Sequence, residues 1–183
     1  MNSEVVIKQV DKWLRSVVID LNLCPFALRE YRQNKIRFSV SKASSEESIL
    51  KELAVELELL SKGDSIETSL LILPKAFTDF LSFNDFLGFA DQLIEEMNFD
   101  GVFQIASFHP NYQFAGTSPS DPENYTNRSP YPILHLLREA SLEQAIEHHP
   151  KTDQIPEDNI ALMTKLGKQH MSALLQNCMS VND

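Results

Sequence analysis

Apolar residues recur at steps of three and four along several stretches of the chain, a spacing that predicts amphipathic helices. The first helix is expected over about residues 4–21, and a short second helix over residues 25–32, with a proline in its first position. Two more are expected over residues 46–62, behind a Ser-Ser-Glu-Glu capping box, and over residues 83–97. The first half of the chain therefore contains at least four predicted helices.

Three stretches between these helices have strand patterns. Ile36, Phe38 and Val40 alternate with polar residues, whereas residues 70–73 are continuously apolar, as in a strand buried on both faces. Residues 102–108 follow an Asp-Gly turn signal and form the third. Strands that alternate with helices favour parallel pairing. The sequence therefore predicts an α/β fold with a small, mainly parallel sheet of about three to four strands, crossover helices and C-terminal helices.

The C-terminal third is expected to be helical in three pieces. Ser129 and Pro130 are typical of a helix start and predict a helix over residues 130–139. A second capping box begins at Ser141, and a longer helix is expected from Pro156 to about residue 176. We expect a single domain over residues 1–183, with a globular core over about residues 5–175.

Charge and cysteine content narrow the class of protein. The 183 residues include 16 basic and 26 acidic side chains, a formal net charge of −10, which argues against nucleic-acid binding. No signal peptide is visible, and the most apolar run is too short to cross a bilayer. The two cysteines, Cys24 and Cys178, show no CxxC spacing, so a disulfide framework is not expected. We expect a cytoplasmic protein that binds neither nucleic acid nor a membrane, with its oligomeric state open.

The segment over residues 107–132 does not resemble an ordinary connection. It contains five of the nine prolines and three of the four tyrosines of the chain. Connections of this length inside compact domains are uncommon and are often functional when they are ordered. We therefore expect a long, ordered loop at the functional site.

The predicted topology places this loop beside other polar residues. The three strands end near Lys42, Lys75 and His109, at the edge where open parallel sheets bind ligands. A helix over residues 130–139 would present His135, Arg138 and Glu139 on one face. The predicted site therefore comprises His109, His135 and Cys24 as candidate catalytic residues and Arg128, Arg138, Glu139, Lys42, Lys75 and Tyr131 as candidate ligand-binding residues.

These residue types suit a small anionic ligand. Arg128 and Arg138 are forked cations that match carboxylate or phosphate oxygens, and His109 or His135 would transfer protons. The alternative is structural, because an Arg–Glu pair and hydrogen-bonded histidines would also hold the long loop against the helix.

Cys24 has two interpretations. At the start of the helix over residues 25–32, near Arg29, it would have a lowered pKa and act as a nucleophile beside a histidine. A free cysteine flanked by Leu23 and Phe26 would otherwise simply pack. Cys24, His109, His135 and Glu139 are also possible metal ligands, but no HxxxH, HExxH or CxxC spacing occurs, so we predict no metal site.

Four segments carry a resemblance to a known family: residues 22–27 (NLCPFA), 108–110 (FHP), 127–132 (NRSPYP) and 135–141 (HLLREAS). Together they resemble a bacterial family catalogued as domain of unknown function 1415, over about residues 5–175. The resemblance implies a small cytoplasmic bacterial protein and supplies no activity, substrate or cofactor.

The leading functional hypothesis is therefore an enzyme-like Arg/His pocket for a small anionic ligand, with the cofactor unknown and enzyme activity left open. One alternative is an interaction or adaptor protein that uses an apolar lip over residues 77–86 and the acidic helix over residues 46–58. The other is a protein that binds metal through histidine and cysteine.

Overall fold

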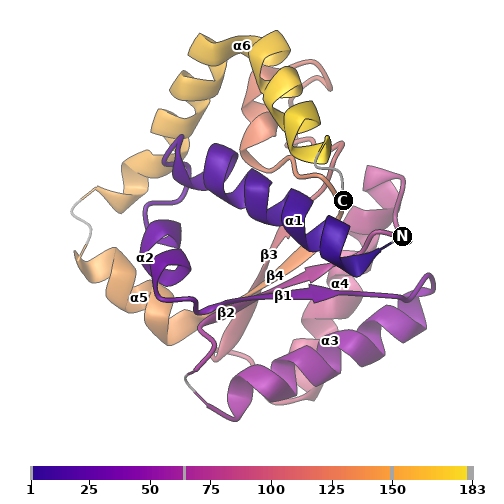
Figure 1. Cartoon of the computed structure of the whole chain (residues 1–183). Helices are drawn as coiled ribbons and strands as arrows, with labels where there is room; N and C mark the ends of the chain where they lie inside the picture. Colours follow the sequence, from indigo (N-terminus) through magenta and orange to yellow (C-terminus); the bar gives the residue numbers. More distant parts are fainter. Residues whose placement is uncertain (1, 64, 149–150, 181–183) are drawn as a thin grey trace.

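The computed structural model describes residues 2–63, 65–148 and 151–180. Helices cover a central sheet on both faces (Figure 1). In chain order the elements are α1 (Ser3–Trp13), the π-helical segment η1 (Leu14–Ile19), α2 (Ala27–Arg32), β1 (Ile36–Val40), α3 (Glu46–Ser61), β2 (Thr68–Ile72), α4 (Phe80–Glu96), β3 (Phe103–Phe108), the 3-10 segment η2 (Pro122–Thr126), β4 (Ile133–Arg138), α5 (Glu139–His148), the 3-10 turn η3 (Thr152–Gln154) and α6 (Ile155–Met179).

The four strands form one sheet in the order β1-β2-β4-β3. β1 and β2 pair in parallel through the crossover helix α3. β4 lies between β2 and β3 and is antiparallel to both, so β2 and β3 run in the same direction without pairing. The α/β class, the crossover helices and the C-terminal helices are confirmed, and the small sheet is mixed, with one adjacent parallel pair.

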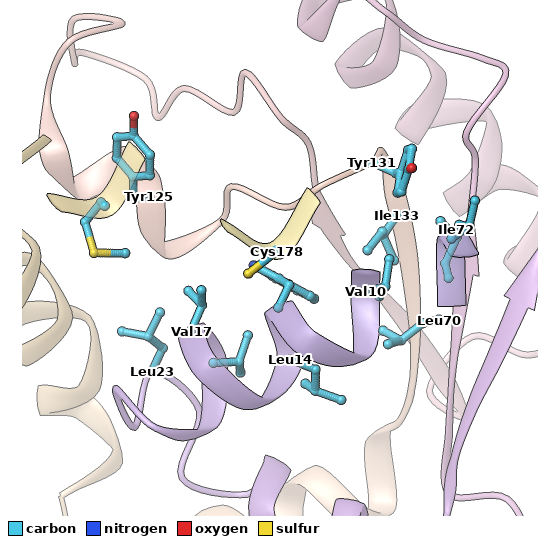
Figure 2. Close-up of a cluster of buried hydrophobic side chains, with 14 of the residues drawn as sticks. Val10, Leu14, Val17, Leu23, Leu70, Ile72, Tyr125, Tyr131, Ile133 and Cys178 are labelled. Carbon is cyan, nitrogen blue, oxygen red and sulfur yellow. The ribbon is translucent and has the colours of Figure 1, made fainter. Parts of the chain in front are cut away.

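Two hydrophobic clusters lie on opposite faces of the sheet. On one face, side chains of α1, η1 and α6 pack against Leu70, Ile72 and Ile133, as Figure 2 shows. On the other face, side chains of α3 and α4 pack against strand residues that include Leu71 and Leu134. Neighbouring strand residues point to opposite faces, so the continuous apolar runs of β2 and β4 contribute to both clusters.

The helix predicted over residues 130–139 is wrong, because Ile133–Arg138 forms β4 and the next helix, α5, begins at Glu139. Leucine-rich residues favour helices, but this segment hydrogen-bonds to a strand on each side and packs apolar side chains on both faces. Tertiary packing therefore outweighs local propensity. As a result, His135 and Arg138 lie three positions apart on a strand and point to opposite faces.

The first predicted helix also differs from the expectation. α1 ends at Trp13, and the chain continues as the π-helix Leu14–Ile19. At its end the amide of Asp20 donates to the carbonyl of Arg15 over 2.8 Å, a five-residue spacing. π-Helical segments are rare and often occur at functional sites.

A buried carboxylate joins β1 to α3. Glu56 of α3 is 4% exposed and accepts hydrogen bonds from Arg37, Ser39 and Ser69. Burial raises the pKa of Glu56, but these hydrogen bonds outweigh burial and hold the pKa below its usual value. The alternating polar residues of β1 therefore satisfy a buried charge rather than facing only solvent.

No helix within the described ranges is long and apolar enough to cross a membrane.

Candidate functional site

A cavity of about 410 Å³ lies between the sheet and the N-terminal helices, within the size range of small-molecule pockets. It adjoins Ile36 and Thr68, the first residues of β1 and β2, so it lies at the amino ends of the parallel strands rather than at the expected carboxyl ends. Its lining is mainly apolar and includes Trp13, Leu14, Val18, Cys24, Pro25, Phe26, Ala27, Ile36, Thr68, Leu70, Ala106, Phe108, His135, Leu137, Leu142 and Ala145.

Three parts of the chain enclose this cavity above the sheet. Trp13, Leu14 and Val18 come from the end of α1 and from the π-helix. The turn of residues 24–27 supplies a second wall, and α5 supplies the third. The π-helical segment therefore contributes directly to the wall of the cavity, and such segments often occur at functional sites.

His135 lies on the floor of the cavity, opposite Leu70 of β2 and Ala106 of β3. Its Nε2 atom lies 2.7 Å from the hydroxyl of Thr68, which in turn donates to the carbonyl of Leu136 over 2.6 Å. Nδ1 forms no hydrogen bond with any of the described residues. The ring lines the cavity, so Nδ1 is the nitrogen of His135 that is left for a ligand.

The ring of His135 is neutral at physiological pH. Burial lowers its pKa from 6.5 to about 4, because a charged imidazolium is poorly solvated there. A neutral imidazole offers one donor and one acceptor nitrogen. His135 therefore acts in the cavity as a polar, uncharged group that accepts a hydrogen bond or a proton.

Cys24 lines the same cavity from the turn before α2. Burial raises the pKa of its thiol, and hydrogen bonds from the backbone at Phe26 and Ala27 offset this only in part. The lowered pKa expected from the helix start is therefore wrong, since α2 begins only at Ala27. The structure brings Cys24 and His135 to one cavity, with the thiol protonated at rest.

Four charged residues border the cavity, two basic and two acidic: Arg29, Arg138, Glu30 and Glu67. Arg29 and Glu30 of α2 line it and form an ion pair of 3.4 Å, in which the arginine side chain is 76% exposed. Glu67 borders the amino end of β2, and one of its carboxylate oxygens is buried without a partner. Opposite charges at the rim nearly balance, so the cavity does not carry the strong positive charge expected of an anion site.

Arg128 lies elsewhere, in the long loop. It is 9% exposed, donates to the carbonyls of Tyr112 and Pro119 and stacks on the ring of Tyr125. Its own carbonyl accepts from the indole N–H of Trp13. These contacts match the structural alternative, in which Arg128 holds the loop in place.

His109 and Tyr131 are also held by internal hydrogen bonds. Nε2 of His109 lies 2.8 Å from the carbonyl of Phe77, Nδ1 accepts from the amide of Asn111, and the ring stacks on Phe83. The hydroxyl of Tyr131 donates to Gln9. Both side chains are buried and neither lines the cavity, so the structure does not bring them together with His135.

Arg138 donates to the carbonyls of Leu60, Gly63 and Ile66, around the C-terminal end of α3. There it satisfies carbonyls that the helix leaves free. Arg138 also borders the cavity, and its Nε atom is buried without a hydrogen-bond partner among the described residues. Glu139 is the first residue of α5, and its amide donates to Val102.

Lys42 and Lys75 are exposed beyond the carboxyl ends of β1 and β2. Lys42 borders a separate shallow depression with Lys51 and Glu52, and neither Lys42 nor Lys75 lines the cavity. Of the nine predicted site residues, three therefore border the cavity: Cys24, His135 and Arg138. The other six are distributed over other parts of the fold.

The features behind the two alternative functions are also located. Phe83 and Phe86 of the expected apolar lip are buried, at 0% and 1% exposure, and pack in the core against Phe77. The described part of the chain contains no group of three or more His, Cys, Asp or Glu side chains placed to hold a metal ion. Neither feature forms a second candidate site.

Several cavity residues were not predicted as functional. Ala106 lies inside the strand predicted over residues 102–108 and Thr68 just before the one predicted over residues 70–73, and neither position carries a functional signal. Ala106 does not stand out by size either, because Ser107 beside it is also small.

Comparison with protein families identifies the chain. Residues 5–173 match the family described as Protein of unknown function (DUF1415), so the chain belongs to this family. The match confirms the resemblance found in the sequence. Comparisons with curated proteins and with solved structures yield no match.

Proposed function

We propose that this protein binds a small, largely apolar molecule in the cavity above His135. The observation that carries the proposal is the cavity itself: about 410 Å³, lined mainly by apolar side chains, with a few polar groups on its floor and wall. This combination is typical of small-molecule sites, where apolar area supplies affinity and a few polar groups set orientation.

The geometry favours this ligand over the anion expected from the sequence. Arg128 and Arg138, which were to hold the anion, donate instead to backbone carbonyls. Arg29 remains, but it is mostly exposed and paired with Glu30. An anion in the cavity would lose its hydration, and the two cations that border it are already engaged: Arg29 with Glu30, and a terminal nitrogen of Arg138 with three backbone carbonyls.

Cys24 and His135 give the site the residue types for chemistry as well as binding. A neutral imidazole accepts a proton, and a thiol that loses its proton becomes a nucleophile. Because the resting thiol is protonated, we assign binding as the function and leave the reaction to be determined.

Fragment binding followed by protein-observed NMR tests the proposal. Aromatic fragments should shift the amide signals of residues that line the cavity and bind saturably. Ala145→Leu fills space in the cavity from α5 and should weaken binding at least about tenfold through steric overlap. Ala140→Leu is the matched control, because it makes the same change at an exposed position of the same helix.

Two results would contradict the proposal. One is saturable binding that Ala145→Leu leaves unchanged. The other is the absence of any binding from a screen of uncharged and anionic fragments.

A further inference from the structure

The fold determines the direction of the hydroxyl proton of Thr68, which lies on the floor of the cavity. The hydroxyl of Thr68 lies 2.6 Å from the carbonyl oxygen of Leu136 and 2.7 Å from Nε2 of His135. A carbonyl oxygen carries no proton, so a contact of 2.6 Å between two oxygens requires the threonine proton to lie between them.

The tautomer of His135 follows from this arrangement. A hydroxyl has one proton, and that of Thr68 is donated to Leu136. Nε2 of the neutral ring must then donate to the hydroxyl oxygen, and Nδ1 is left as an unprotonated acceptor. Nδ1 is also the nitrogen that forms no hydrogen bond with the described residues.

We infer that the cavity selects ligands that present a hydrogen-bond donor, a hydroxyl or N–H group, to Nδ1 of His135. This inference rests on the proposed function and specifies its ligand class: an apolar body with one donor at its polar end. A ligand that covers Nδ1 without a donor leaves a buried acceptor unsatisfied. A carboxylate presents lone pairs to the lone pair of Nδ1, so it is disfavoured.

The neighbours of the ring agree with this selection. Leu70, Ala106 and Phe108 give the floor around His135 apolar surface, and the hydroxyl of Thr68 beside the ring is already engaged with Leu136. One donor placed against Nδ1 would fix the orientation of the ligand. Thr68 acts through His135, as a positioning residue for the tautomer.

Three naphthalenes that differ only in their polar group test the inference. 2-Naphthol carries a donor, 2-methoxynaphthalene replaces it with a methyl ether, and 2-naphthoate carries an anion. Titration by NMR or calorimetry should show 2-naphthol binding at least about tenfold more tightly than either of the others, because an unpaired buried acceptor costs on the order of 1–3 kcal/mol.

The variant His135→Phe separates the donor effect from the added methyl group. It keeps an aromatic ring on the floor and removes the acceptor, so the preference for 2-naphthol over 2-methoxynaphthalene should fall to about twofold or less. Thr68→Val should also reduce the preference, because it no longer fixes the tautomer. Nitrogen NMR of the imidazole should show a proton on Nε2 in the wild-type protein and a mixture of tautomers in Thr68→Val.

The outcomes separate the inference from the proposed function. Equal binding of 2-naphthol and 2-methoxynaphthalene, tightest binding of 2-naphthoate, or a proton on Nδ1 of free His135 would overturn the inference and leave cavity binding intact. If none of the three compounds binds and the wider fragment screen is also negative, the proposed function fails as well.

Discussion

The hydroxyl of Thr68 lies 2.7 Å from Nε2 of His135, on the floor of the cavity. This pair links β2 to β4 by side chains as well as by backbone, since the two strands are neighbours in the sheet. It also determines which nitrogen of His135 is available to a ligand. Removing this hydrogen bond should therefore lower the free energy of unfolding and change the NMR signals of the imidazole.

Thr68→Val preserves the shape of the side chain and removes the hydroxyl. Nε2 of His135 then loses its partner in a buried position, so we expect a loss of about 1–3 kcal/mol in the free energy of unfolding. Chemical denaturation measures this loss. Thr68→Ser keeps the hydroxyl and should retain most of the stability, and a valine variant as stable as the wild type would show that the contact contributes nothing.

The lowered pKa of His135 predicts a pH dependence of stability. The folded ring takes up a proton only near pH 4, whereas the unfolded ring does so near pH 6.5, so the unfolded state binds more protons between these values. The contribution of His135 to the free energy of unfolding is therefore at its full value above about pH 6.5. It falls by on the order of 3 kcal/mol as the pH drops towards 4.

Comparison with His135→Phe isolates that contribution, because carboxylates such as Glu56 titrate in both proteins. Between pH 7 and pH 4 the wild type should lose about 3 kcal/mol more stability than the variant. Denaturation curves that fall in parallel would place the pKa of His135 near its ordinary value.

Cys24 should react slowly with alkylating reagents, because burial raises the pKa of its thiol and keeps the reactive thiolate scarce. Mass spectrometry after iodoacetamide treatment at pH 7 should show slower labelling of Cys24 in the folded protein than in the denatured one. Cys178 is fully buried and should also be protected. Rapid labelling of Cys24 at pH 6 would indicate an activated thiolate instead.

Arg128→Ala should destabilise the fold rather than only weaken ligand binding. The change leaves the carbonyls of Tyr112 and Pro119 without their donor and removes the stacking on Tyr125, so we expect a loss of about 2–4 kcal/mol. Limited proteolysis should detect earlier cleavage within residues 111–122. Arg32→Ala, at an exposed position, should change stability by less than about 0.5 kcal/mol.

The contrary result for Arg128 is also informative. Unchanged stability together with lost binding of phosphate or carboxylate would restore the anion site that the sequence indicates at this residue.

Local patterns in the sequence predict most of the fold. The buried run at Leu70 and the helical spacing of the N-terminal half correctly indicate strands, helices and the α/β class. They do not reveal β4, because the leucines at 134, 136 and 137 fit a helix equally well until two neighbouring strands are present. β4 pairs with β2 across more than sixty residues and with β3 across 25 to 35, and local spacing does not encode either pairing.

The error in β4 changes how two of the predicted site residues lie relative to each other. Placed on a helix, His135 and Arg138 would share one face, whereas on a strand they point to opposite sides of the sheet. Contacts that local spacing does not encode also decide what each polar group does: Arg128 donates to a carbonyl 9 positions away, and Nε2 of His109 lies beside a carbonyl 32 positions away. Residue type alone identifies polar candidates but not whether their donors are already used.

A crystal structure of the protein with 2-naphthol bound tests the central claim most directly. The account predicts the ring system between Trp13 and the sheet, with its hydroxyl within hydrogen-bonding distance of Nδ1 of His135. A cavity that stays closed to the compound, or a compound bound beside Arg128 or on the outer surface, would contradict it.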